Sequence, residues 1–199
     1  MSLLTTLPSL EAKAPWKAHN APSGFTLQTQ KVDGSHWDRI RITTQSRLPP
    51  EKLCDAIWGK GAPPNEAGFK RREVIRETSN ERWTYEQIQT PIVADRDYTM
   101  HAKRVNDEAT HNCQVYFDTQ NDQGPPPQKG IVRIPKVEGY WTVETNDTVE
   151  TGAGQALVTY VLYTEPGGSI PAFLARGSQR KHALEWMQKI LARAQNASQ

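Results

Sequence analysis

The residue types that most often carry catalysis are scattered along this chain of 199 residues. Its histidines accompany no GxSxG, HExxH or Cys–His motif, the arrangements that build nucleophilic or zinc-dependent active sites. They stand at His19, His36, His101, His111 and His182. Asp95 and Asp97 flank an arginine, but a metal site would need further ligands nearby, so a turn with local ion pairing is the better interpretation. The sequence therefore predicts no catalytic residue, no metal and no cofactor.

Cysteine chemistry is equally sparse, since Cys54 and Cys113 are the two cysteines of the chain. They form no CxxC motif and have no paired histidines beside them, which argues against a zinc site and against a disulfide framework. We expect two ordinary, buried or half-buried thiols, which behave as small apolar side chains.

Composition narrows the class of protein further. The net charge is +2, and acidic and basic residues are interspersed without a basic arm, so nucleic acid is not an expected partner. No stretch approaches the roughly 20 apolar residues that span a bilayer. The N-terminus lacks the basic and apolar regions of a signal peptide. We expect a soluble, single-domain, cytoplasmic protein that would meet membranes only at the surface.

Alternating apolar and polar residues predict strands over most of the chain. A short helical lead-in is expected over residues 1–22, and Pro49-Pro50-Glu51 favours the start of a second helix. Asp33-Gly34 is a strong hairpin signal between the first two strands. The predicted strands cover residues 25–29, 37–44, 69–78, 81–90, 96–105, 111–119, 131–137, 140–144 and 155–164.

A long C-terminal helix is predicted over residues 171–195, after the breaking sequence Pro166-Gly167-Gly168, with Ser169 as N-cap. An antiparallel sheet with so few helices must bury one face, and this is the only predicted helix long enough to cover it. The sequence therefore predicts an α+β helix-grip fold, a curved antiparallel sheet wrapped around the terminal helix. A strongly bent sheet would leave an internal hydrophobic cavity between the two layers.

Several stretches resemble the START (StAR-related lipid transfer) family of the same superfold. They occur in the order in which that family has them, between residues 91 and 171. Residues 91–98 (PIVADRDY) and 127–133 (PQKGIVR) resemble two of its strand beginnings, residues 140–143 (YWTV) and 159–162 (TYVL) two of its later strands, and residues 165–171 (EPGGSIP) the start of its lid helix. The resemblance implies that the protein binds a lipid or other hydrophobic small molecule in its cavity.

One departure from the family bears on the ligand. Some sterol-handling members carry a buried acid and a buried arginine on neighbouring cavity strands, and an ungapped count from Arg96 places those positions at Trp83 and Ala102. Because this pair cannot form an ion pair, we expect a more apolar or aromatic pocket, and the ligand class stays open.

The cavity wall is predicted from the same count. If Trp83 lines it, alternation adds Tyr85, and Ala102 brings Met100 and Tyr98. Large amphipathic rings suit an amphiphile whose head must be satisfied once buried. The alternative for each residue is a plain core position. The full set of predicted lining residues is Trp83, Tyr85, Tyr98, Met100, Ala102, Trp141, Tyr160, Phe173, Leu174, Gly177 and Leu184.

Three functions remain open at this stage. The first is binding of a hydrophobic ligand for transfer between membranes or for sensing. The second is a polyketide cyclase or aromatase-like enzyme that would use the same cavity; it needs a cavity-facing acid–base pair, and alternation turns His101 away. The third is an interaction module. Arg176, Arg180 and Lys181 form a basic flank on the terminal helix, which is either a solvated face or a transient contact with an anionic membrane surface.

Overall fold

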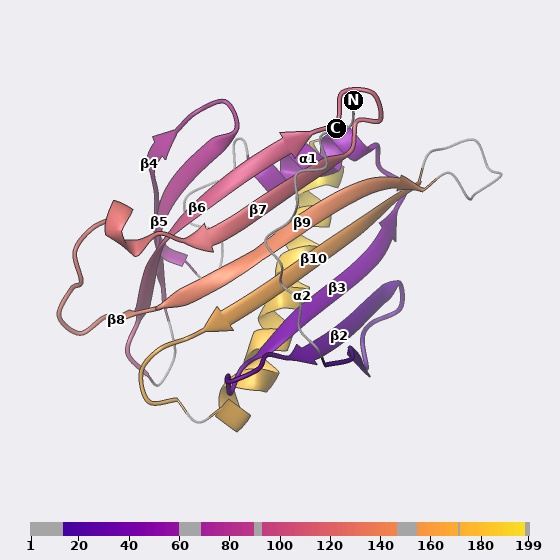
Figure 1. Ribbon diagram of the computed structural model, residues 1–199. Coiled ribbons are helices and arrows are strands. Elements are labelled where there is room, and N and C mark those ends of the chain that lie inside the picture. Colours follow the sequence, from indigo (N-terminus) through magenta and orange to yellow (C-terminus); the bar gives the residue numbers. More distant parts are fainter. Residues whose placement is uncertain (1–13, 60–68, 90–92, 147–154, 171, 198–199) are drawn as a thin grey trace.

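Helix α2 (Ala172–Asn196) lies across one face of an antiparallel sheet, behind the strands in the view of Figure 1. The computed structural model describes residues 14–59, 69–89, 93–146, 155–170 and 172–197. The strands follow the order β1-β2-β3-β10-β9-β7-β6-β5-β4, with β8 beside β6. This arrangement confirms the predicted α+β architecture. The strands are β1 (Lys17–His19), β2 (Phe25–Lys31), β3 (Asp38–Ser46), β4 (Phe69–Glu77), β5 (Glu81–Ile88), β6 (Arg96–Asn106), β7 (Cys113–Thr119), β8 (Val132–Arg133), β9 (Lys136–Asn146) and β10 (Gln155–Glu165).

The sheet bends around α2, because strands near its two opposite edges both meet the helix. At one edge, Trp186 of α2 packs edge-to-face on Phe69 of β4, with ring centroids 5.9 Å apart. Toward the other edge, Arg176 and Gln179 of α2 line a small hollow together with residues of β2 and β3. The buried stripe of α2 comprises Ala183, Met187, Ile190 and Ala194.

The first described strand lies where the sequence predicted a helical lead-in. Lys17–His19 (β1) pairs antiparallel with β2, with His19 opposite Leu27. The His19 ring also shares a hydrogen bond of 2.7 Å with the Thr29 hydroxyl. The helix is therefore wrong for this stretch, because pairing with β2 satisfies backbone groups that so short a helix between prolines would leave open. Residues 1–13 lie outside the described residues.

A second difference concerns the strands after the triple proline, where two separate antiparallel strands were predicted over 131–137 and 140–144. Instead, β9 runs unbroken from Lys136 to Asn146, and the two residues of β8 pair in parallel with β6. Gly139 interrupts the apolar pattern within β9 because a side chain does not fit there. A Cβ at Gly139 would lie 2.0 Å from the Val161 carbonyl oxygen and 2.6 Å from Cζ of Phe117.

Helix α1 (Pro50–Trp58) is joined covalently to β7. Cys54 and Cys113 form a disulfide that links residues 59 positions apart in the sequence, with both residues buried. The expectation of two separate thiols is therefore wrong. No motif pointed to the pair, because the cysteines approach each other only when α1 packs against the end of the sheet, which places their Cα atoms 6.0 Å apart.

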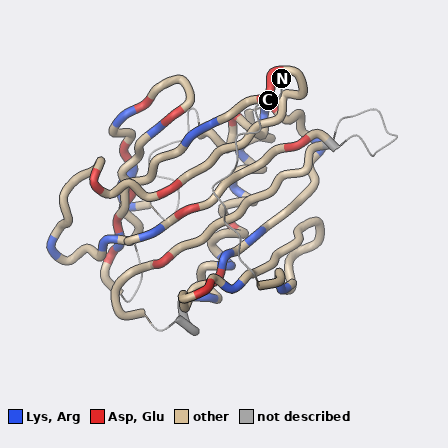
Figure 2. Tube along the Cα trace, in the orientation of Figure 1, with Lys and Arg blue, Asp and Glu red and all other residues tan. Residues whose placement is uncertain are grey.

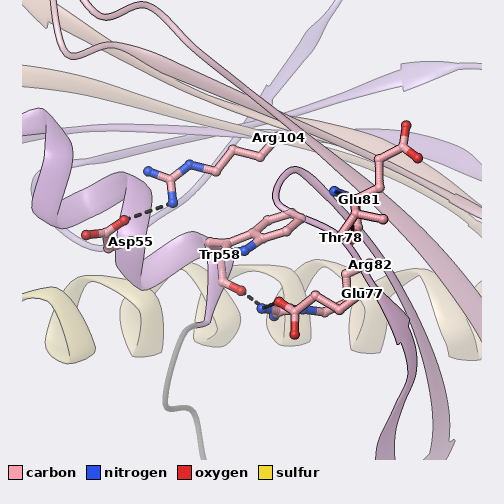
Figure 3. A network of polar contacts seen from close by, with 7 residues as sticks. All are labelled: Asp55, Trp58, Glu77, Thr78, Glu81, Arg82 and Arg104. Atoms are coloured by element: carbon pink, nitrogen blue, oxygen red, sulfur yellow. Dashed lines mark hydrogen bonds and ion pairs between the residues drawn. The ribbon is translucent and has the colours of Figure 1, made fainter.

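Polar contacts also fasten α1, and Figure 3 shows those that reach it from the sheet. Arg104 of β6 donates to the Asp55 carboxylate at 2.8 Å. Arg82 of β5 donates to the Trp58 carbonyl at 2.6 Å and places its guanidinium over the Trp58 ring. Arg193 of α2 donates to another carbonyl in the last turn of α1 at 2.8 Å. The carbonyls that a helix C-terminus leaves without internal partners are thus bonded by side chains from both layers.

The two faces of the sheet differ sharply in character. The face toward α2, here called the helix side, carries most of the apolar core, and the opposite face, here called the outer face, carries mostly polar and charged residues. Lysine and arginine alternate with aspartate and glutamate along the strands and loops (Figure 2). No helix in the described part of the chain has the length and apolar character needed to cross a membrane. The sheet residues buried on the helix side include Leu27, Ile40, Ile42, Tyr98, Val115, Phe117, Trp141, Val143, Val158 and Tyr160.

Candidate ligand site

A group of stacked aromatic rings occupies the middle of the helix side. Trp141 of β9 stands directly opposite Tyr160 of β10 in the strand register, and their rings stack with centroids 4.0 Å apart at an interplanar angle of 13°. The Phe117 ring of β7 lies 6.1 Å from that of Tyr160. Phe117 reaches this position by lying over Gly139, where a side chain would block it. The glycine therefore helps to build the aromatic group.

A row of polar side chains crosses the neighbouring strands on the same side. Arg72 of β4, Glu86 of β5 and Tyr98 of β6 are cross-strand partners. Arg72 Nε lies 3.0 Å from one oxygen of the Glu86 carboxylate, and the Tyr98 hydroxyl donates to the other. Glu86 is only 1% exposed, so its charge depends on these two partners. The site thus contains a compensated charge beside an aromatic surface.

The polar atoms of the stacked pair are unpartnered. No described residue bonds to the Tyr160 hydroxyl or to Nε1 of Trp141, although these side chains belong to residues only 6% and 4% exposed. Neither atom is completely sealed, because the fully sealed polar atoms without a partner do not include them. Buried donors are normally hydrogen-bonded, and leaving one unpaired costs about 1–3 kcal/mol. The pair therefore presents two donors that a bound molecule could satisfy.

Both tyrosines of the site remain neutral over a wide pH range. Burial, reinforced by the negative charge of Glu86, raises the pKa of Tyr98 well above its ordinary value. Burial is also the main cause of the raised pKa of Tyr160, again with a contribution from Glu86. Each phenol is therefore a hydrogen-bond donor at neutral pH.

Helix α2 covers the polar row with an aromatic side chain. The Trp186 ring lies edge-to-face with Phe69, and the guanidinium of Arg72 stands 5.4 Å from the Phe69 centroid and 6.0 Å from that of Trp186. This stacking holds Arg72 in place beside Glu86. The helix thus takes part in the site as well as in the core.

The predicted lining residues fall into three groups. The first lies on the helix side, as expected, with Leu184 of α2 packed against the same cluster. The structure places these residues on the predicted face, and their contact with a ligand stays a prediction. Their positions are Tyr98, Met100, Ala102, Trp141, Tyr160 and Leu184.

The second group is on the wrong face. Trp83 pairs with His101 across β5 and β6, and their rings stack 4.4 Å apart on the outer face, where Trp83 Nε1 donates to Gln120 at 2.8 Å. Tyr85 is on the same face. Cross-strand neighbours share a face, and the partner of Ala102 is Arg82 rather than Trp83. The ungapped count was one residue out of register, which turns a strand over. The expected orientation of His101 away from the helix side is correct.

Because of the same register error, the sequence did not predict the ion pair between Glu86 and Arg72. Glu86 and Arg72 stand on adjacent strands of the helix side, so the expectation of a pocket without a buried acid and arginine is wrong. Alternation from Tyr98 through the register would have found Glu86, its direct partner.

The third group lies on α2. Gly177 is exposed, and a Cβ there would meet nothing within 4 Å, so the prediction that it faces the sheet is wrong. The helix buries the stripe that contains Ala183 and Met187, and Gly177 lies on another side of it. The side chains of Phe173 and Leu174 lie outside what the structure describes.

The basic flank of α2 is partly engaged within the protein. Arg176 donates to the His36 carbonyl at 2.7 Å, and Lys181 lies 3.9 Å from the Glu185 carboxylate one turn later. These contacts favour the interpretation of a solvated helix face.

Three of the family-like stretches meet at one end of the sheet, on its outer face. The Asp97 carboxylate, 1% exposed, accepts from Arg133 at 2.7 and 3.0 Å and from the Tyr85 hydroxyl at 3.0 Å. A Cβ at Gly167 would lie 2.9 Å from the Arg133 carbonyl oxygen. Residues 93–98, 127–133 and 165–170 therefore join β6, β8 and the approach to α2. Asp95 makes a separate ion pair with Lys70 at 2.9 Å, and no described group of acidic, histidine or cysteine residues could hold a metal ion.

A polar hollow of about 420 Å³ lies on the outer face. Its floor is formed by hydroxyl, amide and phenol side chains of β2, β3, β7, β9 and β10, including Tyr116 and Tyr140. The hollow is open and mixed in charge, with Arg41 and Glu144 at its margin. It therefore lacks the apolar lining that a lipid would need.

Solved structures share this architecture. A STAR-related lipid transfer protein from Xanthomonas axonopodis superposes with a TM-score of 0.75 at 22% identity, covering 90% of this chain and 98% of that one. The human StAR-related lipid transfer protein 5 also gives 0.75, at 12% identity, over 94% of this chain and 90% of the other. The sheet and its helix are therefore a START-type helix-grip fold.

Sequence similarity to a known protein shows the family of this chain. The uncharacterized protein PA1579 of Pseudomonas aeruginosa is 30% identical over 165 residues, which are 80% of this chain and 77% of the relative. The chain belongs to the same family as that protein. No protein-family model matches the chain.

Proposed function

We propose that this protein binds a lipid or a similar hydrophobic molecule between the sheet and α2. The observation that carries the proposal is the pair Trp141 and Tyr160, whose polar atoms have no partner among the described residues within a largely apolar face. An apolar wall with a few unpaired polar groups is the usual composition of a small-molecule site. The START-type structural relatives, whose names describe lipid transfer, support the same class of ligand.

Such a ligand would be covered by α2, so exchange requires part of the cover to move. The contacts between α2 and the polar row run through Trp186, which packs on Phe69 and Arg72. Displacement of the helix would expose this row and the aromatic pair together. Transfer between membranes and sensing both need this step, and they differ in whether the ligand is delivered to an acceptor membrane.

An enzyme of the cyclase or aromatase kind is the alternative with the weaker support. General acid–base catalysis requires a group that can take up or release a proton at the substrate. Glu86 is the buried carboxylate of the site, and it is ion-paired with Arg72 and accepts a hydrogen bond from Tyr98. The arrangement therefore favours binding over proton transfer.

Native mass spectrometry of the purified protein tests the proposal, followed by organic extraction of any bound molecule. We expect one lipid-sized ligand per chain, lost on delipidation and regained from vesicles. Trp141→Phe should weaken its retention, whereas Trp83→Phe, a matched change on the outer face, should not. Protein that carries no ligand and binds no member of a lipid panel would contradict the proposal.

A transfer assay then separates the two uses of the ligand. Movement of a fluorescent lipid from donor to acceptor vesicles, at a rate that rises with protein concentration, would support transfer. Stoichiometric uptake without delivery would support sensing. A rate that rises further with anionic acceptor lipid, and that falls when Arg180 and Lys181 are changed to Gln, would indicate contact with the membrane surface.

A further inference from the structure

We propose that the ligand presents an uncharged, hydrogen-bond-accepting oxygen, such as that of an ester or ketone, to Trp141 and Tyr160. This inference rests on the proposed function and names the chemical class of the group that the site binds. Two observations support it. The aromatic pair presents donors without partners among the described residues, and the nearby charges of Glu86 and Arg72 already form an ion pair with each other.

The aromatic pair offers donors rather than acceptors. An indole N–H can only donate, so Nε1 of Trp141 requires an oxygen or nitrogen acceptor on its partner. The Tyr160 hydroxyl stays protonated at neutral pH and can donate as well. The two rings stack with centroids 4.0 Å apart, so both donors belong to one aromatic unit of the helix side. A carbonyl oxygen, with two lone pairs, is suited to accept from one or both of them.

The charges near the pair argue against an ionised head group. An anion would be repelled by Glu86, whose field already acts on Tyr160. Arg72, which could attract it, is paired with Glu86 at 3.0 Å and stacked by Phe69 and Trp186. A cationic head would bring no acceptor for the two donors. An uncharged polar group leaves the existing ion pair intact.

An ester or ketone needs only donors, whereas an alcohol needs an acceptor as well. Its oxygen can accept, but its own hydrogen must then find an acceptor in the same region. Glu86 accepts from Tyr98 through one oxygen, while its other oxygen lies 3.0 Å from Arg72 Nε and has no hydrogen-bond donor in the described part of the chain. An alcohol would have to reach that oxygen to be fully bonded. A buried hydroxyl without an acceptor loses part of the gain from its oxygen. An ester or ketone carries no such hydrogen.

A matched set of 12-carbon probes tests this inference on the delipidated full chain. The probes are dodecane, dodecanol, dodecanoate and methyl dodecanoate, delivered from cyclodextrin. Binding is followed by displacement of the uncharged fluorophore N-phenyl-1-naphthylamine, which does not depend on tryptophan emission. We expect methyl dodecanoate to bind about threefold to tenfold tighter than dodecane, the range of one net hydrogen bond, with dodecanoate weaker than the ester.

The variant Tyr160→Phe removes only the hydroxyl. It should reduce the affinity for methyl dodecanoate about threefold to tenfold and leave that for dodecane unchanged. Tyr163→Phe is the matched control, because the Tyr163 hydroxyl is already bonded to Ser35 and Glu165 and its strand position faces away from α2. Thermal unfolding of both variants verifies that each remains folded.

The outcomes distinguish failure of the proposed function from failure of the predicted ligand chemistry. If neither the fluorophore nor any probe binds, the proposed function fails and this inference fails with it. If dodecane and the ester bind equally, if dodecanoate binds best, or if Tyr160→Phe acts on every probe alike, the inference is refuted while hydrophobic binding stands. Ester preference that Tyr160→Phe abolishes and Tyr163→Phe retains supports it.

Discussion

Loss of the disulfide between Cys54 and Cys113 should lower the stability of the protein substantially. The bond closes a loop across 59 positions of sequence, and in the chain-entropy account a loop of about 60 residues contributes about 4 kcal/mol at 25 °C. For a chain of this size, each kcal/mol shifts the unfolding midpoint by about 2–4 °C. We therefore expect the reduced protein to unfold roughly 8–16 °C below the oxidised one.

Urea unfolding and thermal scans of oxidised and reduced protein provide the assay. Both cysteines are buried, at 1% and 3% exposure, so reduction should be performed on unfolded chains that are then refolded under reductant. The variant Cys54→Ala/Cys113→Ala supplies the control, because its midpoint should not respond to reductant. Equal midpoints for the oxidised and reduced wild type, or two free thiols by alkylation and mass measurement, would refute the reasoning.

The same thiol measurement bears on where the protein works. Disulfides persist in oxidising compartments, and thiols stay reduced in most cytoplasms. The cytoplasmic location expected from the sequence stays a prediction. Alkylation of cysteines in intact cells, before lysis, would decide it: the reduced form is expected for a cytoplasmic protein, and the oxidised form would place the chain in an oxidising compartment.

Other substitutions test the contacts of the sheet and of α2 separately. Gly139→Ala should destabilise the fold by roughly 1–3 kcal/mol or more in urea unfolding, because its Cβ meets backbone. Gly177→Ala should stabilise it by about 1 kcal/mol in the same assay, because the site is an exposed helix position with open space around it. Asp97→Asn should cost about 1.5–3 kcal/mol in urea unfolding, the range for a hydrogen bond to a charged group, because it leaves the half-buried Arg133 without its counter-charge. Burial raises the pKa of Tyr163 to about 12, so the unfolded state loses its proton first and stability should fall between about pH 10 and pH 12. Tyr163→Phe should lessen that alkaline loss in thermal scans, and an unchanged pH profile would contradict this assignment.

Local signals in the sequence were sufficient to predict most of the elements. Asp33-Gly34 marks a hairpin because few other pairs adopt its backbone angles, and Gly34 has φ of 73°. Proline at the start of α1 and the break before α2 are also set by neighbouring residues. These features depend on the chain within a few positions, so they can be recognised without the fold.

Features that join distant parts of the chain could not be predicted in the same way. The disulfide pairs two cysteines that carry no motif, and β1 becomes a strand only because β2 offers an edge to pair with. The predicted lining residues of the site were wrong in part because of an error in strand register. A displacement of one residue exchanged the faces of β5, so that Trp83 was expected in the cavity and Glu86 was missed.

The side chains that fasten one end of the sheet differ from those that would meet a ligand, although family-like stretches supply both. Trp141 belongs to the stretch 140–143 and Tyr160 to the stretch 159–162. Asp97, Arg133 and Gly167 hold strands and loops together at one end of the sheet. The groups that would meet a ligand, by contrast, include Glu86 and the aromatic pair of β9 and β10. The START-type fold by itself therefore does not specify a ligand. Under the proposed function, side chains on the helix side would set the chemistry of the ligand, and Tyr160→Phe changes one of them while leaving Asp97, Arg133 and Gly167 in place.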